Sequence, residues 1–231
     1  MRHDAPVDAS RVDLLRDLLS STGWVDRTRL FARSLRRSTD HGEGLLLVGT
    51  PTHEPWHLAA HLDDESRYAG LPSLSPTLVR WSPPADAPPH LAYDLSRLEA
   101  ARRGETLFVV APDDPTEQLL ERLADARRAG ATLLAIDSGD EDLAGLAHDE
   151  LIVPSRGLIA PGEPSGLAVA GLGEIDLALP EVSFDTVQHL VSAAAGEQHL
   201  LASNASGGRH GFKERLARVL DGIQGAPVVR D

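Results

Sequence analysis

The stretch that decides the fold is TLFVVAPDDPTEQLLERLADARRAGATLLAID, residues 106–137. It begins with an apolar run at 106–111, continues with a helical pattern at 115–131 and ends with a second apolar run. A proline near the start of the helical pattern, Glu117 in its first turn and Gly130 near its end are typical helix boundary signals. Strand, helix and strand in this order predict the crossover unit of a parallel sheet.

The same alternation of short apolar runs and amphipathic segments extends outward on both sides of this unit. It predicts an α/β fold, a doubly wound five-stranded parallel sheet of flavodoxin-like winding flanked by helices. Ligands of such sheets bind beyond the carboxyl ends of the strands. Further strands are predicted at 44–49, 77–81 and 150–154, and further helices at 55–70, 90–104, 141–147 and 183–197.

The length of 231 residues fits one large domain with additions at both ends. Residues 1–40 are expected to contain two helices, broken near Gly23, that pack on the domain. The domain itself is expected to span residues 41–200, including a Gly- and Pro-rich covering loop or hairpin at 155–181. Residues 201–231 are predicted to form a flexible hinge and a terminal helix at 212–223.

The composition disfavours several classes of partner. Thirty-five acidic residues against 22 basic ones give a formal net charge of -13, which repels nucleic acids and anionic lipids. The apolar runs are too short to cross a bilayer, and the first residues lack the pattern of a signal peptide. There is no cysteine, which excludes disulfides and thiolate chemistry. We therefore expect a cytoplasmic protein that binds neither nucleic acid nor membranes.

Lysine is nearly absent, and this restricts the chemistry further. The single lysine, Lys213, lies in HGFKERL and not in the phosphate-loop motif of nucleotide hydrolases. A Schiff-base mechanism would depend on this one residue. No cofactor and no metal are expected.

Two motifs in the middle of the chain resemble a known family. The helix ends with Ala126-Arg127-Arg128-Ala129-Gly130-Ala131, and the later segment DLAGLAHDELIVP covers 142–154. These are similar to the A-k-x-x-G-A and S-x-L-A-x-x-A-D-x-x-I-x-x-P motifs of the sugar isomerase (SIS) domain family, although Asp142 replaces the serine and His148 is an extra residue. The resemblance is strong over 104–154 and extends over roughly 10–200. It implies a fold of the SIS-domain type, a phosphosugar ligand and a homodimer.

The resemblance also implies where a ligand binds. In the family, hydroxyl-rich loops after the first and third strands hold the phosphate of a sugar phosphate. The corresponding positions in this chain are Gly49, Thr50 and Thr52 in the first loop and Asp113, Asp114 and Thr116 in the second.

The two aspartates conflict with a phosphate ligand. Two unit charges about 5 Å apart repel by roughly 3 kcal/mol at an effective dielectric constant of 20, and a dianion doubles this. A hydrogen bond to a charged group returns only roughly 1.5–3 kcal/mol. We therefore expect an altered ligand, such as a polyol, an amine or a metal-bridged compound. The alternative is that the aspartates only cap the helix that follows.

Candidate catalytic residues lie beside these loops. His53 and Glu54 follow the first strand, where a general base for an enediol proton transfer is expected. The resemblance adds His189 in the late helix as an acid or base, although a half-buried structural histidine is the simpler reading. Glu163 and Glu181 are alternative bases. Three histidines, His53, His57 and His61, have metal-ligand spacing, but Pro55 interrupts the helical pattern between them.

Together these features predict an SIS-like protein that binds a carbohydrate derivative and is non-catalytic or altered in its ligand. The alternative is an active aldose–ketose phosphosugar isomerase. The expected partners are a small carbohydrate derivative and a second copy of the chain.

Overall fold

A five-stranded sheet lies at the centre of the computed structural model, which describes residues 24–40, 42–153 and 184–197. The strand order is β2-β1-β3-β4-β5, and all neighbouring strands are parallel. The predicted fold class, a doubly wound five-stranded parallel sheet, is therefore confirmed. The strands are β1 (Gly44–Gly49), β2 (Pro76–Val79), β3 (Glu105–Ala111), β4 (Thr132–Asp137) and β5 (Asp149–Ile152).

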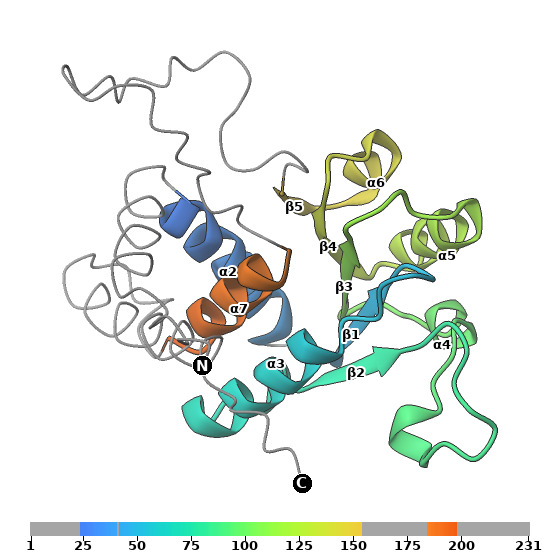
Figure 1. Cartoon of the computed structure of the whole chain (residues 1–231), viewed down its shortest axis with the longest axis horizontal. Coiled ribbons are helices and arrows are strands. Elements are labelled where there is room, and N and C mark those ends of the chain that lie inside the picture. Colours follow the sequence, from blue (N-terminus) through green and yellow to red (C-terminus); the bar gives the residue numbers. More distant parts are fainter. Residues whose placement is uncertain (1–23, 41, 154–183, 198–231) are drawn as a thin grey trace, which may run out of the picture.

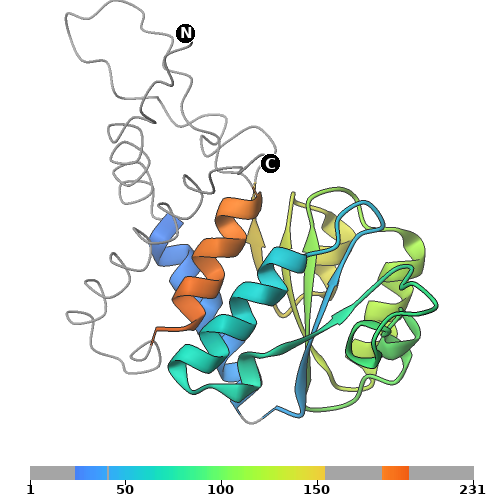
Figure 2. The same ribbon diagram turned by 60° about the horizontal axis from the view of Figure 1, so that its bottom comes forward.

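Helices cover both faces of the sheet, as Figures 1 and 2 show. One face carries α2 (Trp24–Asp40), α3 (Trp56–Ala69) and α7 (Phe184–Ala195). The opposite face carries α4 (Ser96–Glu99), α5 (Glu117–Arg128) and α6 (Glu141–Leu146). Two short 3₁₀ turns, η1 (Pro72–Leu74) and η2 (Pro89–Leu91), lie in the connections.

Each face of the sheet has its own hydrophobic core because successive side chains of a strand point to opposite sides. In β3, Phe108 packs on the α2 side, with its ring centroid 5.5 Å from that of Phe31. Its neighbours Leu107 and Val109 belong to the core beneath α5. All seven residues of β3 are buried. This explains why residues 107–111 form a continuous apolar run and not an alternating one.

Two arginines of α2 bind the end of α7, although these helices are far apart in the sequence. The buried Arg36 donates from Nη1 to the carbonyl oxygens of Ala195, at 2.7 Å, and Glu197, at 3.3 Å. Arg29 forms an ion pair of 2.7 Å with the Glu197 carboxylate. Since α7 also packs against α3, its first turn lies beside the start of α3, close to the carboxyl edge of the sheet.

Most predicted elements within the described residues are confirmed, with boundaries that differ by about two residues, but the single helix predicted for 90–104 is wrong. The chain there forms only the 3₁₀ turn η2 and the four-residue α4. Between them, Tyr93 accepts a backbone hydrogen bond of 2.9 Å from Arg80, and Asp94 pairs with Arg80 as an isolated bridge. This extension of the sheet interrupts the helical pattern.

Some predictions fall on segments outside the described residues. These are the first helix near the N-terminus, the covering loop at 155–181 with Glu163 and Glu181, and the terminal segment with Lys213. Within the described ranges, none of the helices combines the length and the apolar character needed to span a membrane.

Candidate functional site

The winding of the sheet reverses between the carboxyl ends of β1 and β3. The chain leaves β1 towards α3 on one face and leaves β3 towards α5 on the other. Two such loops diverge, and the crevice between them is the usual ligand site of an open parallel sheet. All of the residues predicted to bind the ligand lie in these two loops or, in the case of Gly49, at the end of β1.

The first loop forms a tight turn directly after Gly49. The backbone N–H of His53 donates to the carbonyl oxygen of Thr50 at 3.2 Å, and the indole Nε1 of Trp81 donates to the Gly49 carbonyl at 2.8 Å. A Cβ atom at Gly49 would lie only 1.9 Å from the His53 carbonyl oxygen. Glycine is therefore required by the close return of the chain, and this return places Thr50 and Thr52 side by side.

Asp113 of the second loop joins these two threonines. The Thr50 hydroxyl donates to Asp113 Oδ1 at 2.7 Å, and the Thr52 hydroxyl donates to Asp113 Oδ2 in a short contact. The two hydroxyl oxygens are 3.2 Å apart, and Thr50 is fully buried. The structure thus brings together three of the residues predicted to bind the ligand, and one carboxylate links the two loops.

The hydrogen bonds to Asp113 favour its charged form. Partial burial by itself raises the pKa of this carboxyl, but the hydrogen bonds from Thr52 and Thr50 outweigh the burial, with help from its own backbone and from nearby His53. The net effect holds the pKa of Asp113 below its usual value. Asp113 is therefore an anion at neutral pH.

Helix capping, the alternative role suggested for the aspartates, belongs to another residue. Thr116 is the N-cap of α5, and its side chain accepts a hydrogen bond of 3.3 Å from the N–H of Leu119. The capping interpretation of Asp113 and Asp114 is therefore wrong. Asp114 lies exposed in the same loop. The Thr116 hydroxyl retains its proton for donation, because a hydroxyl can accept and donate at once.

The carboxylate of Glu54, a candidate base, is engaged by three donors. Its Oε2 accepts from Arg80 Nε at 3.1 Å and from the indole of Trp56 at 3.0 Å, and its Oε1 accepts from the backbone N–H of Trp81 at 3.1 Å. The Arg80 guanidinium lies over the Trp56 ring at 4.6 Å. This arrangement joins the first loop to the end of β2 and leaves Glu54 poorly placed to abstract a proton.

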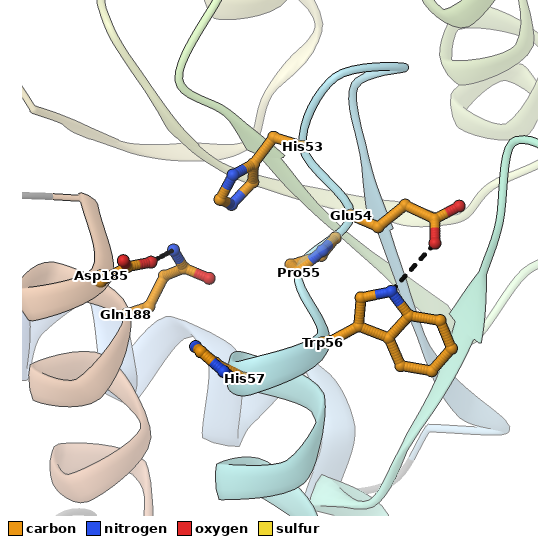
Figure 3. Close-up of a pocket in the computed structure, with 7 residues that line it drawn as sticks. All are labelled: His53, Glu54, Pro55, Trp56, His57, Asp185 and Gln188. Carbon is orange, nitrogen blue, oxygen red and sulfur yellow. Dashed lines mark hydrogen bonds between the residues drawn. The ribbon is translucent and has the colours of Figure 1, made fainter. Parts of the chain in front are cut away.

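A pocket of about 280 Å³ opens beside the first loop (Figure 3). The loop and the start of α3 form one side, and the first turn of α7 forms the other. Figure 3 shows the Gln188 amide between His53 and His57, with its oxygen directed into the pocket and its nitrogen towards Asp185. The lining residues are His53, Glu54, Pro55, Trp56, His57, Asp185 and Gln188.

Two polar atoms of the pocket lining are buried without a hydrogen-bond partner among the described residues. They are Nε2 of His53 and Oε1 of Gln188, and only 3% of the Gln188 surface is exposed. The amide nitrogen of Gln188 donates to Asp185 at 3.4 Å, so only the amide oxygen lacks a partner. Buried polar atoms in native proteins almost always have a partner. These two atoms are therefore available to a polar group that enters the pocket.

His189 lies on α7 next to Gln188 but packs towards α3. Its ring meets that of His61 edge to face, with the centroids 4.2 Å apart. Burial, and then the neighbouring His61, lower the pKa of His189 to about 4, and burial also lowers the pKa of His61. Both rings are neutral at physiological pH. The predicted acid or base is thus a packing partner outside the pocket lining. In the described part of the chain, no three histidine or carboxylate side chains are arranged to hold a metal.

A buried carboxyl pair lies further along the same edge of the sheet. Asp137 ends β4 beside Ala111 of β3 and is fully buried, and its Oδ1 accepts from the N–H of Gly139 at 2.8 Å. Among the described residues no donor reaches Asp137 Oδ2 or Glu150 Oε1. Burial is the main cause that raises the pKa of Asp137 to about 7. The hydrogen bond from Gly139 lowers this pKa, whereas the charge of Glu150 raises it. A proton shared by the two carboxyls explains why neither of these two oxygens has another donor.

Four residues of this edge were not singled out by the sequence analysis: Arg80, Asp137, Asp185 and Gln188. Arg80 and Asp137 come at or just after the ends of predicted strands, and this position was the signal that could have identified them. Asp185 and Gln188 lie within the helix predicted for 183–197, and only His189 of that helix was considered for the site. The contact of α7 with the first loop depends on packing that the local pattern does not contain.

Comparisons with known proteins give similar solved structures only. The sequence matches no protein-family model and no curated protein. One similar structure is the sugar isomerase domain of an RpiR transcription factor from Sphaerobacter thermophilus, with 13% identity, a TM-score of 0.49, and coverage of 92% of this chain and 97% of that one.

Two further similar structures come from other organisms. The Vibrio vulnificus NanR protein, complexed with ManNAc-6P, has 12% identity and a TM-score of 0.46, with coverage of 92% of this chain and 71% of that one. A protein from Methanococcus jannaschii, inferred to be a 3-hexulose-6-phosphate isomerase, has 9% identity and a TM-score of 0.45, with 96% of both chains covered.

Proposed function

We propose that this protein is a non-catalytic, SIS-like module that binds a carbohydrate derivative in the pocket between the first loop and α7. The observation that carries the proposal is the pair of buried, unpartnered polar atoms that line this pocket, His53 Nε2 and Gln188 Oε1. A hydroxyl group donates to one acceptor and accepts from a second group. A ligand with several hydroxyls therefore satisfies both atoms, and the sequence motifs at 126–131 and 142–154 point to the same ligand class.

The absence of catalysis is supported by the state of the candidate bases. A general base needs a free lone pair within hydrogen-bond reach of the proton it removes. Glu54 accepts from three protein donors, and His189 lies outside the pocket lining. His53 alone of the three candidates lines the pocket with a free ring nitrogen. One such group can position a sugar, but among the described residues it leaves the second proton transfer of an isomerisation without a partner.

Ligand binding is expected to stabilise the folded protein and to depend on Gln188. At a ligand concentration of about 100 times Kd, the stabilisation is about 2.7 kcal/mol, or a rise in Tm of roughly 5–10 °C. A thermal-shift panel of hexoses, hexosamines and polyols, each with its phosphate ester, identifies the ligand. Gln188→Leu is expected to weaken the binding of that ligand at least tenfold, because it removes the amide from the pocket.

The matched control is Gln118→Leu, the same change on the exposed surface of α5, which is expected to leave binding unchanged. The shift is measured against each variant's own ligand-free Tm, so a change in stability does not obscure it. The proposal fails if no carbohydrate stabilises the protein or if both variants lose the shift equally. Conversion of a sugar phosphate to its isomer by the wild-type protein would show that the module is an enzyme.

We also propose an oligomeric state and a location for the protein. The resemblance of its sequence to the SIS family implies a homodimer. We further propose that it works in the cytoplasm without a nucleic-acid partner, a proposal supported by its acidic charge and compatible with its lack of cysteine. Light scattering tests the dimer, with an expected mass of about twice the 24.7 kDa of one chain.

A further inference from the structure

We propose that Asp113 is a built-in anion that occupies the anion-binding position of this site and makes the protein select uncharged carbohydrates over phosphate esters. This inference rests on the proposed function and names the ligand class more narrowly. It is carried by the contacts of one carboxylate with two hydroxyl groups from the opposite loop.

The edge of the sheet at this point is suited to an anion. The second loop leads into the N-terminus of α5, a helix of 12 residues, where free N–H groups and the helix dipole favour negative charge. The hydroxyls of Thr50 and Thr52 face the same place from the first loop. A phosphate group, which only accepts hydrogen bonds when ionised, is the usual guest of such a set of donors.

In this protein the two threonine donors are already used. Each threonine hydroxyl has one proton. Thr50 gives its proton to Oδ1 of Asp113, and Thr52 gives its proton to Oδ2. The hydroxyl oxygens then offer only lone pairs to an incoming group. A phosphate would meet two acceptors and a negative charge on the side of the crevice where the threonines lie, and there it needs donors.

The adjacent pocket fits an uncharged guest. Its carboxylates, Glu54 and Asp185, add negative charge, and the nearby Arg80 is paired with Glu54. The unpartnered Gln188 Oε1 accepts hydrogen bonds only. Hydroxyl groups of a sugar or polyol can donate to these acceptors, whereas a phosphate cannot.

The test compares two neighbouring aspartates of the same loop. Asp113→Ser removes the carboxylate and frees both threonine protons. Asp114→Ser removes an equal charge from the neighbouring position, which is exposed like Asp113, but leaves the hydrogen bonds to Asp113 in place. Binding of inorganic phosphate and of the phosphate ester of the best sugar is measured by isothermal titration calorimetry, in parallel with the uncharged sugar.

Asp113→Ser is expected to bind the phosphate ester at least tenfold more tightly than the wild-type protein. Asp114→Ser is expected to bind it at most about twofold more tightly. If the serine variant does not fold, Asp113→Asn removes the charge while keeping the shape of the side chain. The inference is overturned if the wild-type protein prefers the phosphate ester, if both positions give the same gain, or if neither Asp113 variant gains affinity. Failure of the proposed function is separate, since it shows as a lack of binding to the uncharged sugars.

Discussion

Replacement of Gly49 by alanine is expected to destabilise the folded protein by at least about 3 kcal/mol and to abolish carbohydrate binding. The added Cβ would lie 1.9 Å from the His53 carbonyl oxygen and 2.7 Å from Cδ of Pro55. Both atoms belong to backbone or ring, and neither can turn away as a flexible side chain does. Urea unfolding followed by circular dichroism measures the loss.

The loop cannot relieve this clash without further cost. Moving Gly49 breaks the hydrogen bond from Trp81 to its carbonyl oxygen, and moving His53 separates Thr50 and Thr52 from Asp113. The control is Gly145→Ala in α6, where an added Cβ meets nothing within 4 Å. This control is expected to be neutral or to stabilise by about 0.5–1 kcal/mol, because alanine is the better helix former. Equal urea midpoints for Gly49→Ala and the wild-type protein would contradict the prediction.

Asp137→Asn is expected to remove a pH dependence of stability and to stabilise the protein in alkaline solution. The pKa of Asp137 rises from its ordinary value of 3.8 to about 7 on folding. The folded state therefore holds a proton that the unfolded state releases, so stability falls as pH rises from about 4 to 7 and is constant above. Between pH 5 and pH 8.5 the wild-type protein should lose about 2 kcal/mol, or roughly 4–8 °C in Tm.

The asparagine variant retains an oxygen for the N–H of Gly139 and offers an amide N–H to Glu150. It should show little of this pH dependence and exceed the wild-type Tm at pH 8.5. The control Asp142→Asn removes an exposed carboxylate of α6 and should retain the wild-type slope. Parallel Tm curves for Asp137→Asn and the wild-type protein between pH 5 and pH 8.5 would show that Asp137 is ionised throughout.

The fold was largely predictable from the sequence because its main signals are local. The run at 106–111 is apolar at nearly every position since β3 is buried on both faces. The boundaries of α5 are marked by residues within the helix or next to it. The helix predicted for 90–104 failed for the opposite reason. Leu91, Leu95 and Leu98 have helical spacing, but a backbone hydrogen bond from Arg80, 13 positions earlier, holds Tyr93 in an extended segment.

The site was predictable in its location but not in its connections. The loops after β1 and β3 follow from the topology, and Thr50, Thr52 and Asp113 were identified there. The partner of Asp113 lies more than 60 positions away, and nothing within the second loop distinguishes a carboxylate that caps a helix from one that joins two loops. The same limit applies to Gln188, since only the packing of α7 against α3 brings it to the pocket.

The docking of α7, which two arginines of α2 hold at its end, also determines when the pocket can be completed during synthesis of the chain. The ribosome completes the sheet by residue 152, whereas Asp185 and Gln188 emerge only with α7. A chain synthesised only as far as β5 therefore lacks one wall of the pocket. Binding of the proposed carbohydrate in this pocket thus requires α7 and cannot precede its synthesis.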